Sequence, residues 1–321
     1  MTRSMYLITG GAGFIGSHLA HRLLNVGHRV RIVDDLSTGR RDNLAGIADE
    51  VELVEGDIRD PELMAAACRG VDVVLHQAAL PSVPRSVADP RASLDANVMG
   101  TLNVLESARD AGVRRVVQAS SSSVYGDTPV LPKTTAMRPQ PRSPYAVAKL
   151  AAETLGQAFT ASYGLEVVAL RYFNVFGPRQ DPDSAYAAVI PRFIAAVRDD
   201  RDVTIHGDGE QSRDFTYVDN VVDANLRAAR AEGAGGQVFN VATGQAVSVN
   251  AMLATICGQL GRPARVVHEP PRVGDVRDSL ADWAPAAEVL GYAPAVGFEE
   301  GIRRTIASLL AAPPSLIPHR A

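Results

Sequence analysis

Short apolar runs alternate with longer segments of helical periodicity through the first 175 residues. The runs are nearly continuous, a pattern typical of strands that are covered on both faces of a parallel sheet. We expect strands at Met5–Thr9, Val30–Asp34, Val51–Glu55, Val71–His76, Val113–Ser120 and Val167–Arg171. We expect helices at Phe14–Asn25, Pro61–Arg69, Ala92–Ala111 and Pro144–Tyr163. The alternation predicts an α/β fold built on a doubly wound, parallel (Rossmann-type) sheet.

The rhythm changes after Phe176, where a loop-like stretch is followed by shorter elements that are richer in Gly and Pro. Ligands of doubly wound sheets bind beyond the carboxyl ends of the strands, so we expect a smaller C-terminal α/β lobe that closes over this edge. A helix at Tyr217–Arg230 and a strand at Val238–Val241 are expected to pack back on the first domain. The first domain is predicted at 1–176, and residues 217–243 are expected to return to it. The second lobe is predicted at 177–216 and 244–312, followed by a flexible tail at 313–321.

Composition places the 321 residues among ordinary globular chains, with 46% apolar and 21% charged residues, which excludes disordered and fibrous proteins. The net charge of −4 leaves no basic surface for nucleic acid. No apolar stretch approaches the roughly 18 residues that a membrane span requires. The N-terminus runs directly into the first expected strand and leaves no room for a signal peptide, so we expect a cytoplasmic protein. Cys68 and Cys257 stand alone, and we expect no metal site.

A glycine-rich turn follows the first strand and opens the first helix. Gly10, Gly13 and Gly16 have the spacing G-x-x-G-x-x-G, a variant of the dinucleotide-binding fingerprint. The N-terminus of the helix offers unpaired N–H groups and a favourable dipole to an anion. The turn is therefore a candidate pyrophosphate site.

Polar residues at the ends of the next two strands extend this candidate site. Asp34 ends the second strand 18 residues past Gly16, where a carboxylate accepts the 2′-hydroxyl of ribose and repels a 2′-phosphate. This pattern favours NAD, although Arg40 and Arg41 nearby keep NADP as an alternative. Asp57 and Ile58 follow the third strand, within expected reach of the adenine.

Tyr145 and Lys149 are four residues apart on an expected helix, so they share one face. A tyrosine hydroxyl, with a pKa of about 10, is a poor base at neutral pH. A nearby ammonium, together with the positive ring of an oxidised nicotinamide, favours the phenolate and lowers that pKa. The chain holds 30 arginines but only two lysines, Lys133 and Lys149, which makes a chance Tyr-x-x-x-Lys rare. The pair is therefore a candidate general acid–base.

Further ordered motifs accompany this pair over nearly the whole chain. They are Asp57-Ile58, the serine run before Val124-Tyr125-Gly126, Ser143-Pro144 before Tyr145, Leu170 to Arg179, Arg213-Asp214-Phe215, and Arg272 to Val276. Together with the glycine turn, Asp34 and the Tyr-Lys pair, they make the chain resemble the extended short-chain dehydrogenase/reductase superfamily. Within it, the chain is most similar to bacterial UDP-sugar 4-epimerases of the UDP-glucose and UDP-N-acetylglucosamine group. The resemblance implies NAD as cofactor and a UDP-sugar bound by the second lobe.

The resemblance also implies catalytic roles. The hydroxyl four residues before Tyr125, that of Ser121, would hydrogen-bond the reacting sugar oxygen, with Ser122 as the alternative because adjacent strand residues face opposite ways. Tyr145 would remove the proton of the 4-hydroxyl while the C4 hydride passes to NAD⁺, and the hydride would return to the other face of a 4-keto sugar. The catalytic candidates are Ser121, Tyr145 and Lys149. The cofactor candidates are Gly10, Gly13, Phe14, Ile15, Gly16, Asp34, Asp35, Thr38, Gly39, Asp57, Ile58, Gln77, Ala78, Ala79, Asn97, Tyr145, Lys149 and Tyr172.

The substrate side follows from the same resemblance. Arg213 and Arg272 are assigned to the UDP pyrophosphate, because planar guanidinium forks suit phosphates, and Asn174 lies in the same region. Asp275 would hold the ribose or an arginine, and backbone groups near residues 187–190 would bound the uracil. The substrate candidates are Ser121, Ser122, Tyr145, Asn174, Ala188, Val189, Arg213, Arg272, Asp275 and Ser279.

Ser279 bears on the choice of sugar. Family members restricted to non-acetylated sugars often carry a bulky side chain at this position, whereas a serine leaves room for an N-acetyl group. A pocket with spare room rejects a smaller sugar only weakly, by about 1–3 kcal/mol. We therefore expect UDP-glucose/UDP-galactose and also UDP-GlcNAc/UDP-GalNAc as substrates.

Three other functions compete with this interpretation. Sugar-nucleotide 4,6-dehydratases place Asp-Glu directly after the catalytic hydroxyl residue, where this chain has two serines. UDP-glucuronate 4-epimerases and decarboxylases handle a carboxylate that Arg85 or Arg277 could bind, although uronate epimerases usually carry Thr in place of Asn174. A dinucleotide-binding sensor without turnover would be expected to have lost the Tyr-Lys pair. Family members commonly dimerise, which implies a homodimer through a four-helix bundle of Ala92–Ala111 and Pro144–Tyr163.

Overall fold

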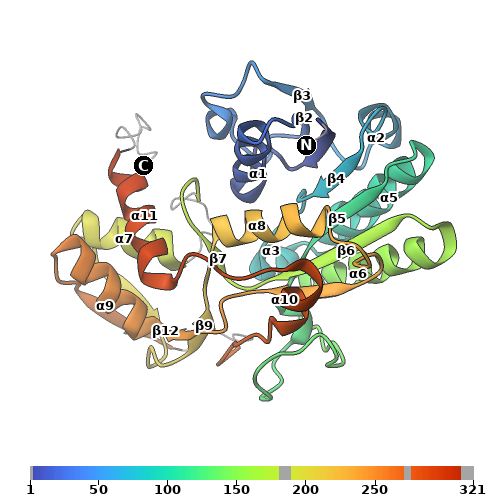
Figure 1. Ribbon diagram of the computed structural model, residues 1–321. Helices are drawn as coiled ribbons and strands as arrows, with labels where there is room; N and C mark the ends of the chain where they lie inside the picture. The colour runs from blue at the N-terminus through green and yellow to red at the C-terminus, as the bar shows by residue number, and fades with distance from the viewer. Residues whose placement is uncertain (1–2, 181–188, 271–275, 312–321) are drawn as a thin grey trace.

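The computed structural model describes residues 3–180, 189–270 and 276–311. Its larger lobe is built on a seven-stranded sheet whose order is β11-β6-β5-β4-β1-β2-β3 (Figure 1). All neighbouring pairs are parallel. The strands are β1 (Met5–Thr9), β2 (Arg29–Asp34), β3 (Val51–Glu55), β4 (Val73–His76), β5 (Arg115–Ser121), β6 (Glu166–Tyr172) and β11 (Val238–Val241). The expectation of a doubly wound α/β fold is confirmed.

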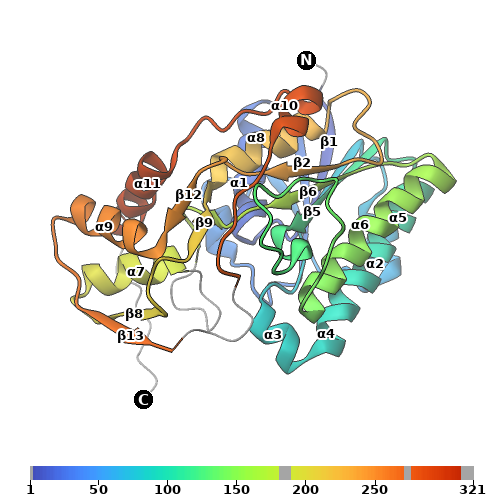
Figure 2. The same ribbon diagram turned by 90° about the horizontal axis from the view of Figure 1, so that it is seen from below.

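Helices cover both faces of this sheet, as Figures 1 and 2 show. One face carries α1 (Phe14–Asn25), α8 (Val218–Ala228) and α10 (Ala284–Leu290), and the other carries α2 (Pro61–Ala67), α5 (Gly100–Asp110) and α6 (Pro144–Tyr163). Alternate residues of β1 serve the two cores: Tyr6 and Ile8 pack with α1 and α8, whereas Met5 and Leu7 pack with α2 and α5. Burial on both faces explains why the strands read as continuous apolar runs.

In its described residues, the smaller lobe has two short sheets and three helices. β8 (Val203–His206) pairs with β13 (Val266–Glu269), and β9 (Ser212–Asp214) pairs with β12 (Ala246–Ser248). The helices are α7 (Val189–Arg198), α9 (Val249–Leu260) and α11 (Phe298–Ala311). Its core contains Phe176, Phe215, Tyr217 and Phe298, whose rings contact one another. β7 (Val175–Phe176) and β10 (Thr216–Tyr217) pair where the chain passes between the lobes.

The returning segment adds to the larger lobe. β11 pairs with β6 at the edge of the sheet, and α8 packs against α1. Most of α8 and all of β11 thus belong to the first sheet and its helical cover, whereas Tyr217 and Val218 pack in the core of the smaller lobe. The remaining domain boundaries stay a prediction.

The largest difference from the expected elements lies between residues 83 and 110. The single helix expected at Ala92–Ala111 is divided into α4 (Pro90–Leu94), a π-helix at Asp95–Met99 and α5, and α3 (Val83–Ala88) precedes them unexpectedly. The π-turn accommodates one extra residue and brings Asn97 into the interior, where its amide bonds the backbone of Leu80. Elsewhere the ends of elements differ by one or two residues; for example, the strand expected from Val71 begins at Val73.

Within the described ranges, no helix is long and apolar enough to cross a membrane. The same ranges contain no group of three or more His, Cys, Asp or Glu side chains that could hold a metal ion.

Candidate active site

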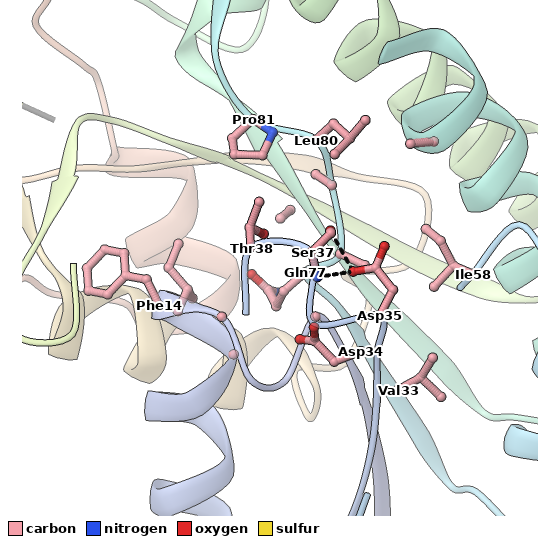
Figure 3. Close-up of a pocket in the computed structure, with 18 of the residues that line it drawn as sticks. Phe14, Val33, Asp34, Asp35, Ser37, Thr38, Ile58, Gln77, Leu80 and Pro81 are labelled. Carbon is pink, nitrogen blue, oxygen red and sulfur yellow. Dashed lines mark hydrogen bonds between the residues drawn. The ribbon is translucent and has the colours of Figure 1, made fainter. Parts of the chain in front are cut away.

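A pocket lies at the carboxyl ends of β1, β2, β4, β5 and β6, where the strand order reverses between β1 and β4 (Figure 3). A crevice at such a reversal is the usual ligand site of doubly wound sheets. Sixteen of the predicted cofactor residues line it: Gly10, Gly13, Phe14, Ile15, Gly16, Asp34, Asp35, Thr38, Asp57, Ile58, Gln77, Ala78, Ala79, Tyr145, Lys149 and Tyr172. Gly39 and Asn97 do not line it.

The glycine turn leaves no space for side chains at two positions. Gly10 has φ +69°, and a Cβ there would lie 2.7 Å from the backbone nitrogen of Ala78. A Cβ on Gly16 would lie 2.1 Å from the carbonyl oxygen of Gly10. Gly13 caps the N-terminus of α1 without a side-chain hydrogen bond, so the first N–H groups of the helix are left for another acceptor. This geometry fits a pyrophosphate laid against the turn.

Two adjacent carboxylates at the end of β2 differ in what they bind. Asp34 is buried, and its carboxylate accepts hydrogen bonds from the backbone N–H groups of Ala12 and Leu36, both at 2.9 Å. Burial raises its pKa, and these hydrogen bonds oppose the shift. Asp35 is exposed and accepts from the N–H and hydroxyl of Ser37 (Figure 3). Asp34 thus braces the glycine turn, and Asp35 is the more accessible partner for a ribose hydroxyl.

Hydrogen bonds fix the loop after β4, which lines the pocket at residues 77–81. The Oγ1 of Thr9 accepts from the Ala78 N–H at 3.3 Å and contacts Nδ1 of the buried His76 at 2.7 Å. Asn97, from the π-helix, accepts from the Leu80 N–H at 2.7 Å and donates to the Leu80 carbonyl at 3.1 Å. Asn97 therefore acts on the pocket by positioning this loop.

Tyr172 closes the inner end of the pocket. Its hydroxyl donates to Gln77 Oε1 at 3.1 Å and accepts from Asn225 Nδ2 at 2.8 Å, and Gln77 in turn donates to Asn225. Burial raises the pKa of Tyr172 to about 12, while both hydrogen-bond partners lower it. Tyr172 consequently stays a neutral hydroxyl at physiological pH.

Tyr145 and Lys149 project into the pocket from the first turns of α6, which Ser143 caps by accepting the Ala146 N–H. Lys149 Nζ donates to the Ala119 carbonyl at the end of β5 at 3.0 Å and lies 5.9 Å from the centroid of the Tyr145 ring. Ser121 lies close enough to Tyr145 to lower its pKa, although Ser121 does not line the pocket. Ser121 ends β5 and Ser122 opens the 3-10 turn that follows, so which of the two faces the sugar stays a prediction.

Burial has opposite effects on the pKa values of this pair. It lowers that of Lys149 to about 8, although Glu153 raises it, so the ammonium predominates at pH 7. Burial raises the pKa of Tyr145, and the hydrogen bond with Ser121 lowers it. The lowering that we expected for Tyr145 is therefore not produced by the protein alone. It requires a further positive charge in the pocket.

Three other predicted substrate residues, Asn174, Arg213 and Ser279, lie on the smaller lobe's side of the site. Asn174, at φ +33°, donates to the Asp214 carbonyl at 3.1 Å and to the Ser279 hydroxyl at 3.3 Å. Arg213 donates to the Arg277 carbonyl at 3.0 Å. These residues form a cluster apart from the cofactor pocket. Val189 opens α7, and the remaining candidates, Ala188, Arg272 and Asp275, lie outside the described residues.

Sequence analysis did not name nine residues that line the pocket, which are Val33, Ser37, Gly56, Arg59, Leu80, Pro81, Ala96, Ala119 and Ser120. Each lies within two residues of one that was named, so extending each motif by two positions would have found them. It also missed Asn225, which reaches Tyr172 from α8, and Glu153, one turn after Lys149. Those two have no local motif that points to the site.

The fold and this site define a dinucleotide-binding protein with a Tyr-Lys pair beside the cofactor cleft. A family model described as the NAD dependent epimerase/dehydratase family matches residues 6–242. The chain belongs to this family.

Individual relatives cover almost the whole chain. A UDP-glucose 4-epimerase of Mycolicibacterium smegmatis is 44% identical over 304 residues, which are 94% of this chain and 96% of the relative. The solved structure of a UDP-N-acetylglucosamine 4-epimerase from Methanobrevibacter ruminantium, in complex with UDP-N-acetylmuramic acid, matches with a TM-score of 0.93 and 38% identity, covering 97% and 99% of the two chains. A UDP-glucose 4-epimerase of Thermus thermophilus in complex with NAD matches with a TM-score of 0.89 and 37% identity, covering 96% and 99%.

NAD is the cofactor of this family, and the residues present suit it. The glycine turn packs so closely that a Cβ at Gly10 or Gly16 would meet other backbone atoms, the N-terminus of α1 opens at the pocket, and two carboxylates end β2. The three relatives named above are UDP-sugar 4-epimerases.

Proposed function

We propose that the protein interconverts the C4 epimers of UDP-hexoses through a transient 4-keto sugar, with Tyr145 as the acid–base group. The observation that carries this proposal is that Tyr145 and Lys149 line the pocket that holds the glycine turn and the β2 carboxylates, with Ser121 close to Tyr145. When bound, NAD accepts a hydride from the sugar carbon and returns it, so the reaction has no net oxidation.

The protein residues divide the proton chemistry between them. Tyr145 Oη takes the proton of the 4-hydroxyl and later gives it back. Lys149, fixed by the Ala119 carbonyl, supplies the positive charge that favours the phenolate. The Ser121 hydroxyl, beside Tyr145, orients the reacting oxygen of the sugar.

The smaller lobe binds the nucleotide in this proposal. Arg213 and Arg272 hold the pyrophosphate, Asp275 and residues near Ala188 and Val189 contact the nucleoside, and Asn174 lies between them and the sugar. The Ser279 hydroxyl is small and bonded to Asn174, which supports space for a 2-acetamido group. UDP-glucose, UDP-galactose and their N-acetylated counterparts are therefore the proposed substrates.

A uronate is the second candidate substrate, and the contacts of Arg277 argue against it. Arg277 binds Asp208 at 3.0 Å on the exposed surface, so its guanidinium is already neutralised away from the pocket. A non-catalytic sensor is disfavoured because Ser121, Tyr145 and Lys149 lie together in the pocket region.

We also propose that the protein is a homodimer through its α6 side. Large apolar side chains are exposed on α3, α4, the π-helix and α6, all of which pack together. They are Val83, Val87, Leu94, Met99 and Val147. A second copy of this surface would cover them in a helical bundle.

Product chromatography tests the activity. The protein is incubated with NAD⁺ and separately with UDP-glucose, UDP-GlcNAc and UDP-glucuronate, and a Tyr145→Phe variant serves as control. We expect epimers of unchanged mass from the first two substrates and none from the variant. Conversion of UDP-glucose alone would refute the argument from Ser279. Conversion of UDP-glucuronate alone would show that the substrate is a uronate and not one of the proposed hexoses. If none of the three UDP-sugars is converted, the proposal is refuted.

A further inference from the structure

Glu153 is a carboxylate in the interior, one helical turn after Lys149 on α6. It is 2% exposed, and Lys149 is 6% exposed. Residues four apart on a helix are neighbours, and Glu153 raises the pKa of Lys149 against the effect of burial. In the proposed mechanism Glu153 touches neither substrate nor cofactor.

Glu153 is itself held by a buried arginine. Arg171 Nε donates to Glu153 Oε1 at 2.9 Å, and Arg171 Nη2 donates to Oε2 at 2.8 Å. The Ser120 hydroxyl also donates to Oε1, and Ser120 lines the cofactor pocket. Arg171 stacks over the ring of Tyr125, 4.7 Å from its centroid. One carboxylate therefore lies between two buried cations, in direct contact with Arg171 and within one turn of Lys149.

We propose that Glu153 and Arg171 are positioning residues that set the charge of Lys149, and through it the acid–base function of Tyr145. Glu153 holds the proton on Lys149, and Arg171 limits this effect by neutralising Glu153. The inference rests on the proposed roles of Tyr145 and Lys149.

The raising of the Lys149 pKa is assigned to Glu153 because the other ionisable groups described around Lys149 do not produce it. Its own helix contributes Tyr145, β4 contributes His76 and β6 contributes Tyr172, and all three are neutral at pH 7 because burial disfavours their charged forms. Tyr125, on the 3-10 turn after β5, packs on Arg171. Arg85, Arg91 and Asp95 lie on α3, α4 and the π-helix, and none of them shifts the pKa of Lys149.

Neutralising Glu153 and Arg171 in turn distinguishes two roles for this ion pair. The pair either only stabilises the packing of α6 on β6 or sets the charge of Lys149. If the pair only holds α6 to β6, Glu153→Gln and Arg171→Gln damage the protein in the same way. If it sets the charge of Lys149, the variants act in opposite directions. Glu153→Gln removes a negative charge and exposes Lys149 to Arg171, so the lysine loses its proton more easily. Arg171→Gln leaves Glu153 with Lys149 as its nearest cation, so the proton is held more tightly.

The chain allows Lys149 to be observed directly, because it contains only two lysines. Protein labelled with ¹³Cε-lysine gives two signals, and Lys149→Ala identifies which one belongs to Lys149. The titration is recorded with the full-length protein for the wild type, Glu153→Gln, Arg171→Gln and the double variant. Glu166→Gln is the matched control, because Glu166 pairs with buried Arg115 at 2.6 Å.

The control pair joins β5 to β6, whereas the test pair joins α6 to β6. Arg115 faces Glu166 across β5 and β6, in the register that places Ser120 beside Arg171. Glu166 and Arg171 are five residues apart along β6, about 16 Å.

We expect the midpoint for Lys149, about 8 in the wild type, to fall by about 1 pH unit or more in Glu153→Gln and to rise by a similar amount in Arg171→Gln. The double variant should return near the wild type, and Glu166→Gln should not move. Shifts in the same direction, or no shift in either variant, would overturn the proposal. If Glu153→Gln does not fold, Arg171→Gln must still titrate above the double variant, and equal midpoints would overturn it.

Epimerase assays provide the second measurement. The alkaline limb of the kcat profile should move to lower pH in Glu153→Gln and to higher pH in Arg171→Gln, following the Lys149 signal. If the wild type converts no UDP-sugar, the proposed function fails, yet the titration of Lys149 still decides this inference.

Discussion

The buried imidazole of His76 is predicted to make the stability of the protein depend on pH. It is 4% exposed, and its Nδ1 and Nε2 lie 2.7 Å from Thr9 Oγ1 and 2.9 Å from Thr101 Oγ1. The Thr101 hydroxyl donates its only proton to the Asn97 carbonyl at 2.7 Å, so it accepts from His76 Nε2–H. Nδ1 is then the acceptor for the Thr9 hydroxyl. With a neutral imidazole, each hydrogen bond of this network has one donor and one acceptor. A second proton, on Nδ1, would point at the Thr9 hydroxyl, which is itself the donor in that hydrogen bond.

The cost of protonation follows from the pKa values. Burial, with a smaller effect of Lys149, lowers the pKa of His76 to about 3, against 6.5 for an unperturbed histidine. The unfolded chain therefore takes up a proton as the pH falls below 6.5, and the folded protein does not until about 3. Stability is unaffected above 6.5 and falls through that window. At pH 5 the loss is about 2 kcal/mol, from about 1.36 kcal/mol for each of 1.5 pH units.

Urea unfolding at pH 7 and pH 5 measures this loss. His76→Gln keeps one donor and one acceptor but does not titrate, so its decrease between the two pH values should be about 2 kcal/mol smaller than that of the wild type. His18, whose pKa is lowered to about 4 chiefly by burial, should behave in the same way in His18→Gln, and the two effects should add. If His76→Gln lost as much stability as the wild type between pH 7 and pH 5, a charged or solvated His76 would be indicated and the assignment of its hydrogen bonds refuted.

Three further predictions concern the cofactor turn, the pocket loop and the dimer. Gly16→Ala places a methyl group 2.1 Å from the Gly10 carbonyl and should weaken NAD binding at least about tenfold, or about 1.4 kcal/mol, in a fluorescence titration with NADH; unchanged affinity would show that the turn can widen. Asn97→Ala removes both hydrogen bonds to the Leu80 backbone. It should lower the free energy of unfolding in urea by about 1–3 kcal/mol and weaken NAD binding. A loss of stability without a loss of NAD affinity would show that the position of this loop does not affect NAD binding. Val87→Asp combined with Val147→Asp should give monomers by light scattering, whereas Val130→Asp, at an exposed position outside this surface, should not; dimers in the double variant would place the interface elsewhere.

The sequence predicted those parts of the fold and site that local pattern determines. The strands were found because burial on both faces produces continuous apolar runs, and the glycine turn was found because close backbone contacts at Gly10 and Gly16 require glycine at fixed spacing. The π-helix around Asn97 was missed, since its apolar pattern continues that of the flanking helices and its cause, the bond to Leu80, is tertiary.

Long-range partners were missed for a similar reason. Asn225 reaches Tyr172 across 53 residues, and no local signal marks it. Asp34 lines the pocket, and its ribose contact stays a prediction; what the sequence did not reveal is that its carboxylate also accepts from the Ala12 and Leu36 backbone, because Asp34 ends β2 directly against the glycine turn.

The structure shows where the two lysines of this arginine-rich chain lie. Both lysines are buried, yet their surroundings differ. Lys133 is 2% exposed and donates from Nζ to the carbonyls of Thr128 and Val130, and its own carbonyl accepts from Asn240 Nδ2. It organises a loop beside β11, and it does not line the cofactor pocket.

A guanidinium could not replace Lys133 without leaving several of its five donors unsatisfied in the interior, whereas an ammonium is compact enough for two carbonyls. In a chain that otherwise uses arginine, a retained lysine therefore marks a buried site that requires a small cation. Whether that cation is structural or catalytic depends on a second feature. For Lys149 that feature is Tyr145 one turn earlier, and Lys133 has no counterpart to it.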